Sequence, residues 1–223
     1  HDALPIWTSR NFRRELDAEI VEFDAHERVP ETFAFDGVVV TGSKASVYWD
    51  DPWIGRLNDW VEVAVGHGLP HLGVCYGHQV LAQAIGGEVR DMDGYEIGYR
   101  EVDRIGDSLL LEGLTDRFTV FTTHGDEVTE LPPGAEPIAE NEYSNHGFRR
   151  DHVFSVQFHP EYDRATAVRV TKAKDFLGEE RIQRTLAGIT DENVRRAHEA
   201  KRLFDNFVRY VQETRPVDRA AVR

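Results

Sequence analysis

Apolar residues in the first half of the chain alternate between short continuous runs and helical spacing. Residues 35–41 and 70–74 are nearly continuous apolar runs, which are typical of strands covered on both faces. Residues 53–65 and 78–85 repeat apolar side chains at helical spacing and end at glycines. Strands that alternate with helices predict an α/β fold, with a mostly parallel open sheet flanked by helices in the flavodoxin-like manner.

The segment before the first apolar run predicts one more helix and one more strand. Cap and turn residues precede Phe12 and Leu16, which stand at helical spacing. Residues 20–23 are suited to a strand. The chain reaches its first helix within about ten residues, and no apolar strand precedes that helix.

The middle of the chain favours strands, and the last quarter favours helices. Strands are expected at residues 108–111, 118–122, 136–140 and 153–158. From residue 163 onward the pattern is helical, and Thr190 can cap a helix whose first turn is acidic. An apolar stripe that includes Phe204 and Phe207 is expected to pack against the core rather than to bind a partner helix. We therefore expect an α/β domain over residues 1–162 and a helical extension, 163–223, packed on the same domain.

Composition limits the partners and the environment. The 223 residues carry 40 acidic and 26 basic side chains, so the chain repels phosphate backbones and nucleic acid is not an expected partner. No apolar run reaches the roughly 18 residues of a membrane span, and we expect a cytoplasmic protein. Only four basic residues are lysines, which suits the salt-rich cytoplasm of a halophile. The alternative is an ordinary acidic protein from a genome that favours arginine codons.

The only cysteine lies in Gly73-Val74-Cys75-Tyr76-Gly77, between a predicted strand and a predicted helix. Glycines on both sides of a nucleophile permit a sharp strand-to-helix turn, and the following helix directs its N-terminus at the thiol. The alternative is a buried structural cysteine, because free cysteine is among the most buried residue types. The strand and helix context favours the nucleophile. A single cysteine excludes an internal disulfide.

A cysteine nucleophile needs a base and a group that orients the base. Among the ten histidines, His159 directly follows the expected strand 153–158, and Glu161 follows after a proline that ends the strand. An imidazole and a carboxylate are thereby expected at the C-terminal edge of the sheet, where active sites of α/β proteins assemble.

Gly-Val-Cys75-Tyr-Gly-His-Gln79, together with Gln-Phe-His159-Pro-Glu161, resembles the class I (triad) glutamine amidotransferase family. The likeness covers about residues 20–162 and is greatest to the glutaminase domain of GMP synthase and its stand-alone relatives. It implies that Cys75 attacks the side-chain amide of glutamine and forms a γ-glutamyl thioester. His159 would protonate the departing ammonia and then activate water, and Glu161 would orient the imidazole.

The resemblance also implies a set of oxyanion donors. The loop Thr41-Gly42-Ser43 follows a strand, as the family's glycine-rich oxyanion loop does. A backbone N–H of Gly42 or Ser43, together with that of Tyr76, would hold the developing oxyanion. The proline that the family usually has in this loop is absent here.

Contacts to the substrate are implied by the same likeness. Gln79 resembles one glutamine contact of the family. The segment that contains Asn145, Gly147 and Phe148 resembles one that binds the α-amino and carboxylate groups of glutamine. For Asn145 and Gly147 the alternative is a simple turn.

No cofactor is implied, and no metal is expected. His124-Gly-Asp126-Glu127 could suggest a metal site, but no second histidine stands at a matching spacing.

Three function classes remain open. A glutaminase would supply ammonia to a separate ATP-dependent synthetase subunit, whereas a stand-alone hydrolase would act on γ-glutamyl compounds. The third class is a non-catalytic regulator with the same fold. The complete set of Cys75, His159, Glu161 and Gln79 favours an enzyme. The family's first strand is not visible and the chain has no initiator methionine, so we expect the natural start to be missing from this sequence.

Overall fold

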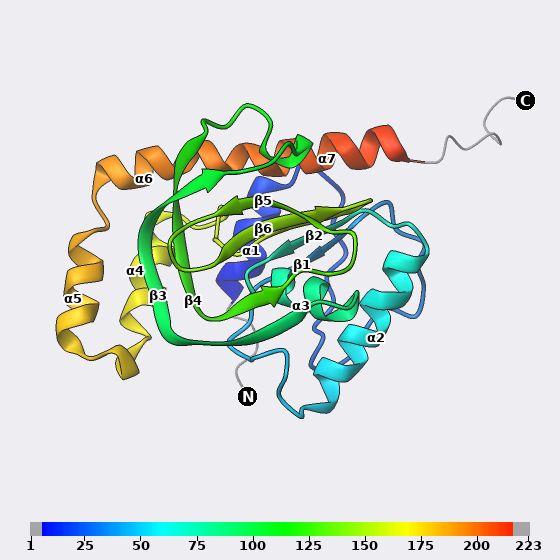
Figure 1. The fold of residues 1–223 in the computed structure, drawn as a ribbon, viewed down its shortest axis with the longest axis horizontal. Helices are drawn as coiled ribbons and strands as arrows, with labels where there is room; N and C mark the ends of the chain where they lie inside the picture. Colours follow the sequence, from blue (N-terminus) through cyan, green and yellow to red (C-terminus); the bar gives the residue numbers. More distant parts are fainter. Residues whose placement is uncertain (1–5, 216–223) are drawn as a thin grey trace, which may run out of the picture.

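A computed structural model describes residues 6–215, and these form one open sheet with helices on both faces (Figure 1). The seven strands lie in the order β1-β2-β7-β6-β5-β3-β4. The strands are β1 (Val38–Val40), β2 (His71–Val74), β3 (Glu88–Arg104), β4 (Arg117–Glu130), β5 (Glu136–Glu140), β6 (Asn145–Arg150) and β7 (Val153–Val156). The helices are α1 (Ile6–Glu15), α2 (Pro52–Gly66), α3 (Tyr76–Ala84), α4 (Arg164–Lys172), α5 (Glu179–Ala187), α6 (Asp191–Ala197) and α7 (Arg202–Thr214). Three 3-10 turns are η1 (Leu109–Leu111), η2 (Asp175–Leu177) and η3 (His198–Lys201).

The sheet combines a parallel half and an antiparallel half. β1, β2 and β7 pair in parallel, whereas β6, β5, β3 and β4 join in antiparallel pairs. The expected open α/β sheet with flanking helices is confirmed, but its parallel pairing is confined to three strands. The helices α2 and α3 follow β1 and β2, as parallel crossovers require, while short connections join β5 to β6 and β6 to β7 as hairpins.

Two apolar layers enclose the parallel half. On one face, α2 and α3 bury residues such as Val61 and Leu81 against the sheet. On the other face, Phe12 of α1 and Phe204 of α7 pack on β2 and β7, so the sheet is covered on both sides. This double burial explains why β2 is buried at every position and why it appears as a continuous apolar run.

The C-terminal helices cover the far half of the sheet. A smaller apolar cluster joins β3 and β4 to α4 and to the segment before α6. Thr190 caps α6 as expected, because its side chain accepts a hydrogen bond from the N–H of Asn193. The apolar stripe of α7 packs on the core, and Phe204 and Phe207 are buried. Figure 1 shows α6 and α7 running along one side of the sheet.

Two of the expected strands are wrong, and two strands of the sheet were not expected. Residues 20–23 form no strand; together with β1 they line a groove of about 720 Å³. Residues 108–111 form a 3-10 turn, in which the side chain of Ser108 accepts from the N–H of Leu110. β3 was missed, since charged residues interrupt its apolar pattern. β6 was missed because its Asn-His-Gly start has the composition of a turn.

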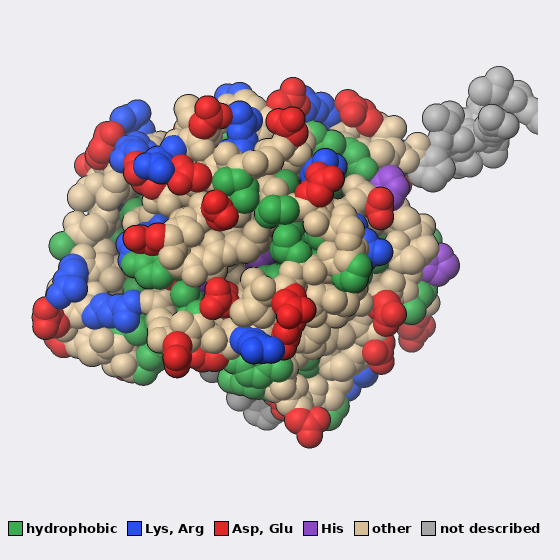
Figure 2. Space-filling view, in the orientation of Figure 1, with side chains coloured by type: hydrophobic (Ala, Val, Ile, Leu, Met, Phe, Trp, Pro, Cys, Tyr) green, Lys and Arg blue, Asp and Glu red, His purple; other side chains and the backbone are tan. Residues whose placement is uncertain are grey.

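The surface agrees with the acidic composition. Figure 2 shows carboxylates spread over the whole visible face, with basic groups interspersed among them. In the described part of the chain, no helix combines the length and the apolar character needed to cross a membrane.

Candidate active site

Cys75 occupies a strained turn between β2 and α3. Its backbone has φ 56° and ψ −106°, a conformation that residues with a side chain rarely adopt. Its N–H donates to the carbonyl of Val156 in β7 at 2.9 Å, which ties the turn to the central strand. The cysteine is 5% exposed. Strain of this kind at a thiol is typical of a nucleophile turn and is not required of a packing cysteine.

The flanking glycines are needed for packing. A Cβ atom at Gly77 would lie 1.9 Å from the carbonyl oxygen of Val40, and one at Gly73 would lie 2.4 Å from that of Gly77. The first turn of α3 can therefore lie directly against β1 and β2 only because both positions are glycine. The pattern seen in the sequence thus has a steric cause.

His159 and Glu161 form a buried pair just beyond β7. The N–H of His159 donates to the carbonyl of Phe121 at 2.8 Å, and its Nδ1 lies 2.8 Å from Oε1 of Glu161. Because an ionised carboxylate only accepts, Nδ1 carries a proton, and Nε2 is the nitrogen left for chemistry. Tyr162 stacks on the imidazole with ring centres 4.1 Å apart, and Arg14 donates to the carbonyl of Glu161 at 2.9 Å.

The predicted base and nucleophile both lie close to Gly42, in the predicted oxyanion loop. A Cβ atom at Gly42 would lie 3.2 Å from Cε1 of His159 and 3.8 Å from Cβ of Cys75. Burial alone would lower the pKa of His159, but the charges of Cys75 and Glu161 raise it to about 10. The arrangement therefore stabilises a protonated imidazole beside the sulfur.

The predicted oxyanion donors lie around the same point. Tyr76 is the first residue of α3, where backbone N–H groups have no partner within the helix. Gly42 lies directly against the imidazole, and the side chain of Ser43 accepts from the N–H of Ala45 at 3.2 Å. Gly42 and Tyr76 are thus both close to Cys75, and their role as oxyanion donors stays a prediction.

Two of the predicted substrate contacts, Gln79 and Phe148, are buried in the protein. Gln79 is buried, and its Nε2 donates to the carbonyl of Asp126 and to Oε1 of Gln157. Asn145 accepts from the N–H of Gly147 at 3.1 Å at the start of β6, and Phe148 is fully buried in the core beneath α3. The substrate roles of these residues stay predictions. Because Phe148 is fully buried, its side chain has no exposed atom that could contact a substrate.

The chain segment beside the sulfur is instead the middle of β4. The carbonyl of Thr123 lies 3.9 Å from Sγ of Cys75, and the Thr123 hydroxyl lies 2.9 Å from that of Tyr95. Tyr95, Thr123 and Tyr162 were not singled out in the sequence. Tyr162 could have been found in the sequence, because it directly follows Glu161. Tyr95 and Thr123 could not, because they reach the site through the long-range pairing of β3 with β4.

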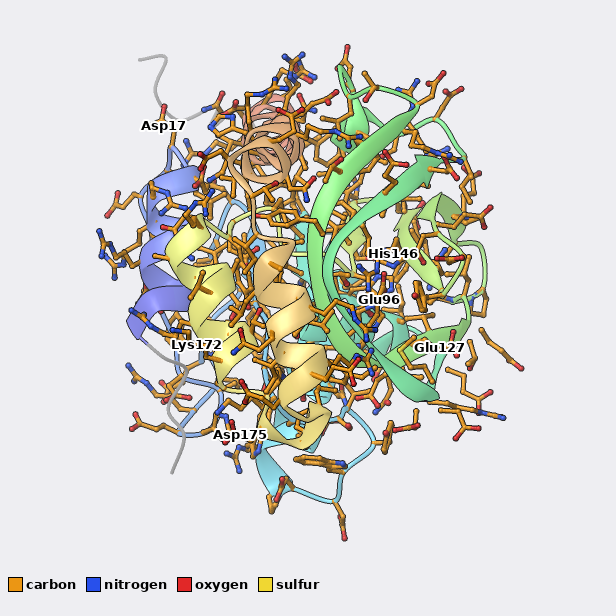
Figure 3. The ribbon with its side chains drawn as sticks, turned by 90° about the vertical axis from the view of Figure 1, so that its left-hand side faces the viewer. Asp17, Glu96, Glu127, His146, Lys172 and Asp175 are labelled. Carbon is orange, nitrogen blue, oxygen red and sulfur yellow. The ribbon has the colours of Figure 1, made fainter. Side chains whose placement is uncertain are left out.

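One buried polar cluster lies behind this segment. Glu96, His124 and His146 are buried, and the ligand atoms they offer lie within 4.8 Å of one another (Figure 3). The sequence shows no second histidine at a matching spacing from His124, but the fold brings His146 from β6 to this cluster. In the residues described, no other group of three such side chains could hold a metal ion.

Hydrogen bonds engage both oxygens of Glu96 and the facing nitrogens of the two histidines, whereas Nδ1 of His146 has no partner in the described structure. Oε2 of Glu96 lies 2.7 Å from Nε2 of His124 and 3.1 Å from that of His146, and its Oε1 accepts from Asn141. Burial would raise the pKa of Glu96, but the hydrogen bonds and charges of the two histidines hold it well below its usual range. Nδ1 of His124 also faces an acceptor, the carbonyl of Asp126 at 2.9 Å. These hydrogen bonds link β3, β4 and β6.

Known proteins match most of this chain in sequence. A family profile described as "Glutamine amidotransferase class-I" matches residues 8–176. A glutamine-hydrolyzing GMP synthase from Thermomicrobium roseum is 38% identical over 154 residues, which are 67% of this chain and 28% of that protein. Another from Aromatoleum aromaticum is 36% identical over 175 residues, 74% of this chain and 32% of that protein. The chain thus spans about a third or less of these relatives.

Solved structures show the same fold. A glutamine amidotransferase from Thermotoga maritima superposes with a TM-score of 0.67 at 28% identity, covering 76% of this chain and 77% of that one. A glutamine amidotransferase from Methylobacillus flagellatus gives a TM-score of 0.76 at 23% identity over 94% and 90% of the two chains. The family profile matches most of the chain, and residues 8–176 include Cys75, His159 and Glu161, so the chain belongs to the class I glutamine amidotransferase family.

Proposed function

We propose that this chain releases ammonia from the side-chain amide of glutamine through a thioester on Cys75. The observation that carries the proposal is the convergence of three groups. Cys75 is held at a positive φ, Gly42 lies against both reacting residues, and His159 is hydrogen-bonded to the buried Glu161. A packing cysteine would need none of these features.

The first half-reaction forms the thioester. The Cys75 thiolate attacks the amide carbon, and the carbonyl oxygen becomes an oxyanion held by the N–H of Tyr76 and one from the Gly42–Ser43 loop. The protonated His159 then gives its proton to the amide nitrogen, and the carbon–nitrogen bond breaks as ammonia leaves.

The second half-reaction hydrolyses the thioester. His159, now neutral, takes a proton from a water molecule, and the hydroxide attacks the thioester carbon. The carbon–sulfur bond breaks, glutamate leaves and the thiolate–imidazolium pair is restored. Glu161 keeps the Nδ1 proton in place, so that Nε2 faces the reacting atoms in both halves.

The names of the relatives support a partner as well as a substrate. The curated relatives cited above are glutamine-hydrolyzing GMP synthases, and the chain matches about a third or less of their length. We propose that the ammonia passes to a separate ATP-dependent synthetase, which uses it to aminate an acceptor.

Ammonia release from glutamine, measured with and without a candidate synthetase, tests the proposal. We expect activity in the wild type, none in Cys75→Ala, and a loss of about 10²- to 10⁴-fold in His159→Asn. Glu180→Gln is the control, because Glu180 is exposed on α5 and pairs only with Arg184 among the residues described. Activity that survives Cys75→Ala would contradict the proposal, and turnover of γ-glutamyl peptides but not of glutamine would favour a γ-glutamyl hydrolase.

A further inference from the structure

The carboxylate of Asp126 in β4 accepts hydrogen bonds from two side chains that follow the predicted oxyanion loop. Its Oδ2 accepts from the hydroxyl of Ser46 at 2.6 Å, and its Oδ1 accepts from the hydroxyl of Tyr48 at 2.7 Å. Asp126 and Ser46 are each only 9% exposed. The neighbouring residue Glu127 is labelled in Figure 3. A nearly buried carboxylate thus ties β4 to a segment that is distant in sequence.

That segment has little internal structure of its own. Residues 41–51 connect β1 to α2 and contain neither a helix nor a strand. They also contain no proline, and glycine at position 42 leaves the backbone free to adopt many conformations. Groups that take part in a reaction must be held within about 0.5 Å of their working geometry. Contacts with other elements must therefore hold this loop in place.

The contacts of residues 46–48 reach the predicted oxyanion donors through a few residues. Val47 is buried, and its carbonyl accepts from Nε2 of Gln83 in α3 at 3.1 Å. The N–H of Ala45, next to Ser46, donates to the hydroxyl of Ser43 at 3.2 Å. Gly42 precedes Ser43 and lies against the imidazole of the predicted base. A shift of Ser46 would therefore move Ser43 and Gly42 relative to the sulfur.

Asp126 is itself firmly held. It pairs with Asp91 of β3, and its backbone carbonyl accepts from Nε2 of Gln79 at 3.2 Å and lies 2.9 Å from Nδ1 of His124. Burial raises the pKa of Tyr48, and the charge of Asp126 adds to that effect, so the hydroxyl keeps its proton and remains a donor. The carboxylate is therefore a fixed point to which the loop is attached.

Resting on the proposed function, we propose that Asp126 is a positioning residue for the oxyanion loop. Through Ser46 and Tyr48 it keeps the backbone N–H groups of Gly42 and Ser43 directed at the oxyanion that forms next to the sulfur. Because it acts through the loop, its loss slows only those reactions of the cysteine in which a carbonyl oxygen becomes an oxyanion.

Two reagents separate this role from a general effect on the cysteine. With p-nitrophenyl acetate, the Cys75 thiolate attacks the ester carbonyl, an oxyanion forms, and p-nitrophenolate leaves. With iodoacetamide, the thiolate displaces iodide from a saturated carbon, and no oxyanion forms. Because the chain has one cysteine, the Cys75→Ala protein gives the background of both reactions. Steady-state ammonia release from glutamine gives kcat and KM alongside these two rates.

The variants of the full chain remove the contact from either side. Asp126→Ala removes the acceptor, and the double variant Ser46→Ala/Tyr48→Phe removes both donors. Asp126→Asn is the conservative variant, because an amide can still pair with two hydroxyls. Asp103→Ala is the matched control, since Asp103 on β3 also accepts two hydrogen bonds, from Arg117, but both side chains are exposed.

Asp126→Ala should lower kcat for ammonia release and the rate of Cys75 acylation about ten- to hundred-fold, because the loop donors are misplaced. KM and the iodoacetamide rate should stay within about threefold of wild type. The double variant should show the same losses, and adding Asp126→Ala to it should cost no more than about twofold further. Asp126→Asn should recover most of the lost rate, and Asp103→Ala should match wild type.

Unchanged acylation in Asp126→Ala and in the double variant would overturn the role of Asp126. An equal loss with both reagents would also overturn it, because the defect would then lie in the cysteine and not in the oxyanion loop. If acylation falls as expected but the wild type releases no ammonia from glutamine, only the proposed glutaminase function fails. A wild-type Cys75 that reacts with neither reagent would contradict both proposals.

Discussion

Because the backbone at Cys75 is strained, we expect glycine at this position to give a more stable protein than alanine, the reverse of the usual order. Replacing glycine by alanine normally stabilises a protein, because glycine loses more conformational freedom on folding, by about 0.5–1 kcal/mol. At φ 56° and ψ −106°, however, any Cβ atom is strained, at a cost of about 1–3 kcal/mol. The Cys75→Gly variant should therefore be more stable than Cys75→Ala by about 1 kcal/mol.

In a domain of this size, a difference of 1 kcal/mol corresponds to about 2–4 °C in Tm. Calorimetric melting and urea unfolding of the two variants, both purified as the full chain, measure it directly. Gly55 in α2 provides the matched control, because no atom lies within 4 Å of a Cβ placed there. Gly55→Ala should raise the free energy of unfolding by about 1 kcal/mol.

The two comparisons together decide whether the strain is real. If Gly55→Ala stabilises as expected while Cys75→Ala is as stable as Cys75→Gly or more so, Cys75 is not strained. That result would contradict the interpretation of residues 73–77 as a strained nucleophile turn and would favour a buried structural cysteine.

Further predictions concern the packing of the site and the response to acid. Gly77→Ala should destabilise the fold by about 3 kcal/mol or more in urea unfolding, because its Cβ would overlap the carbonyl of Val40; near-wild-type stability would refute the close contact. Gly42→Ala should lower kcat at least about tenfold while changing Tm little, because its methyl group presses on the imidazole of His159 at 3.2 Å; unchanged kcat would show that the loop lies elsewhere. Burial lowers the pKa of His71 to about 4 in the folded protein. As the pH falls, this residue therefore takes up a proton in the unfolded chain at a higher pH than in the folded chain, which favours unfolding. The free energy of unfolding should drop by about 2 kcal/mol from pH 7 to pH 5 on account of this residue, and a His71→Gln variant with the same pH slope as wild type would disprove it.

Local steric rules made the core of the site predictable. The turn at Cys75 depends on glycines two residues away on either side. A short apolar strand precedes it and an amphipathic helix follows it, so a few adjacent residues were enough to predict the turn. His159 and Glu161 were equally accessible, because each follows directly from where strand β7 ends.

Features that depend on pairing between distant segments could not be predicted. Glu96 faces His124 only because β3 and β4 pair in that register, and His146 joins them from β6. Tyr95 reaches Thr123 through the same pairing. Residues 20–23 show the converse: their composition suits a strand, but a strand forms only where a neighbour is close enough to share backbone hydrogen bonds.

The direct test of the central claim is covalent labelling of the full chain with a glutamine analogue whose side-chain amide is replaced by an electrophilic diazoketone, followed by peptide mass spectrometry. The account predicts one label per chain, on Cys75, and labelling that glutamine prevents. A label on another residue, or Cys75 modification that glutamine leaves unaffected, would contradict it.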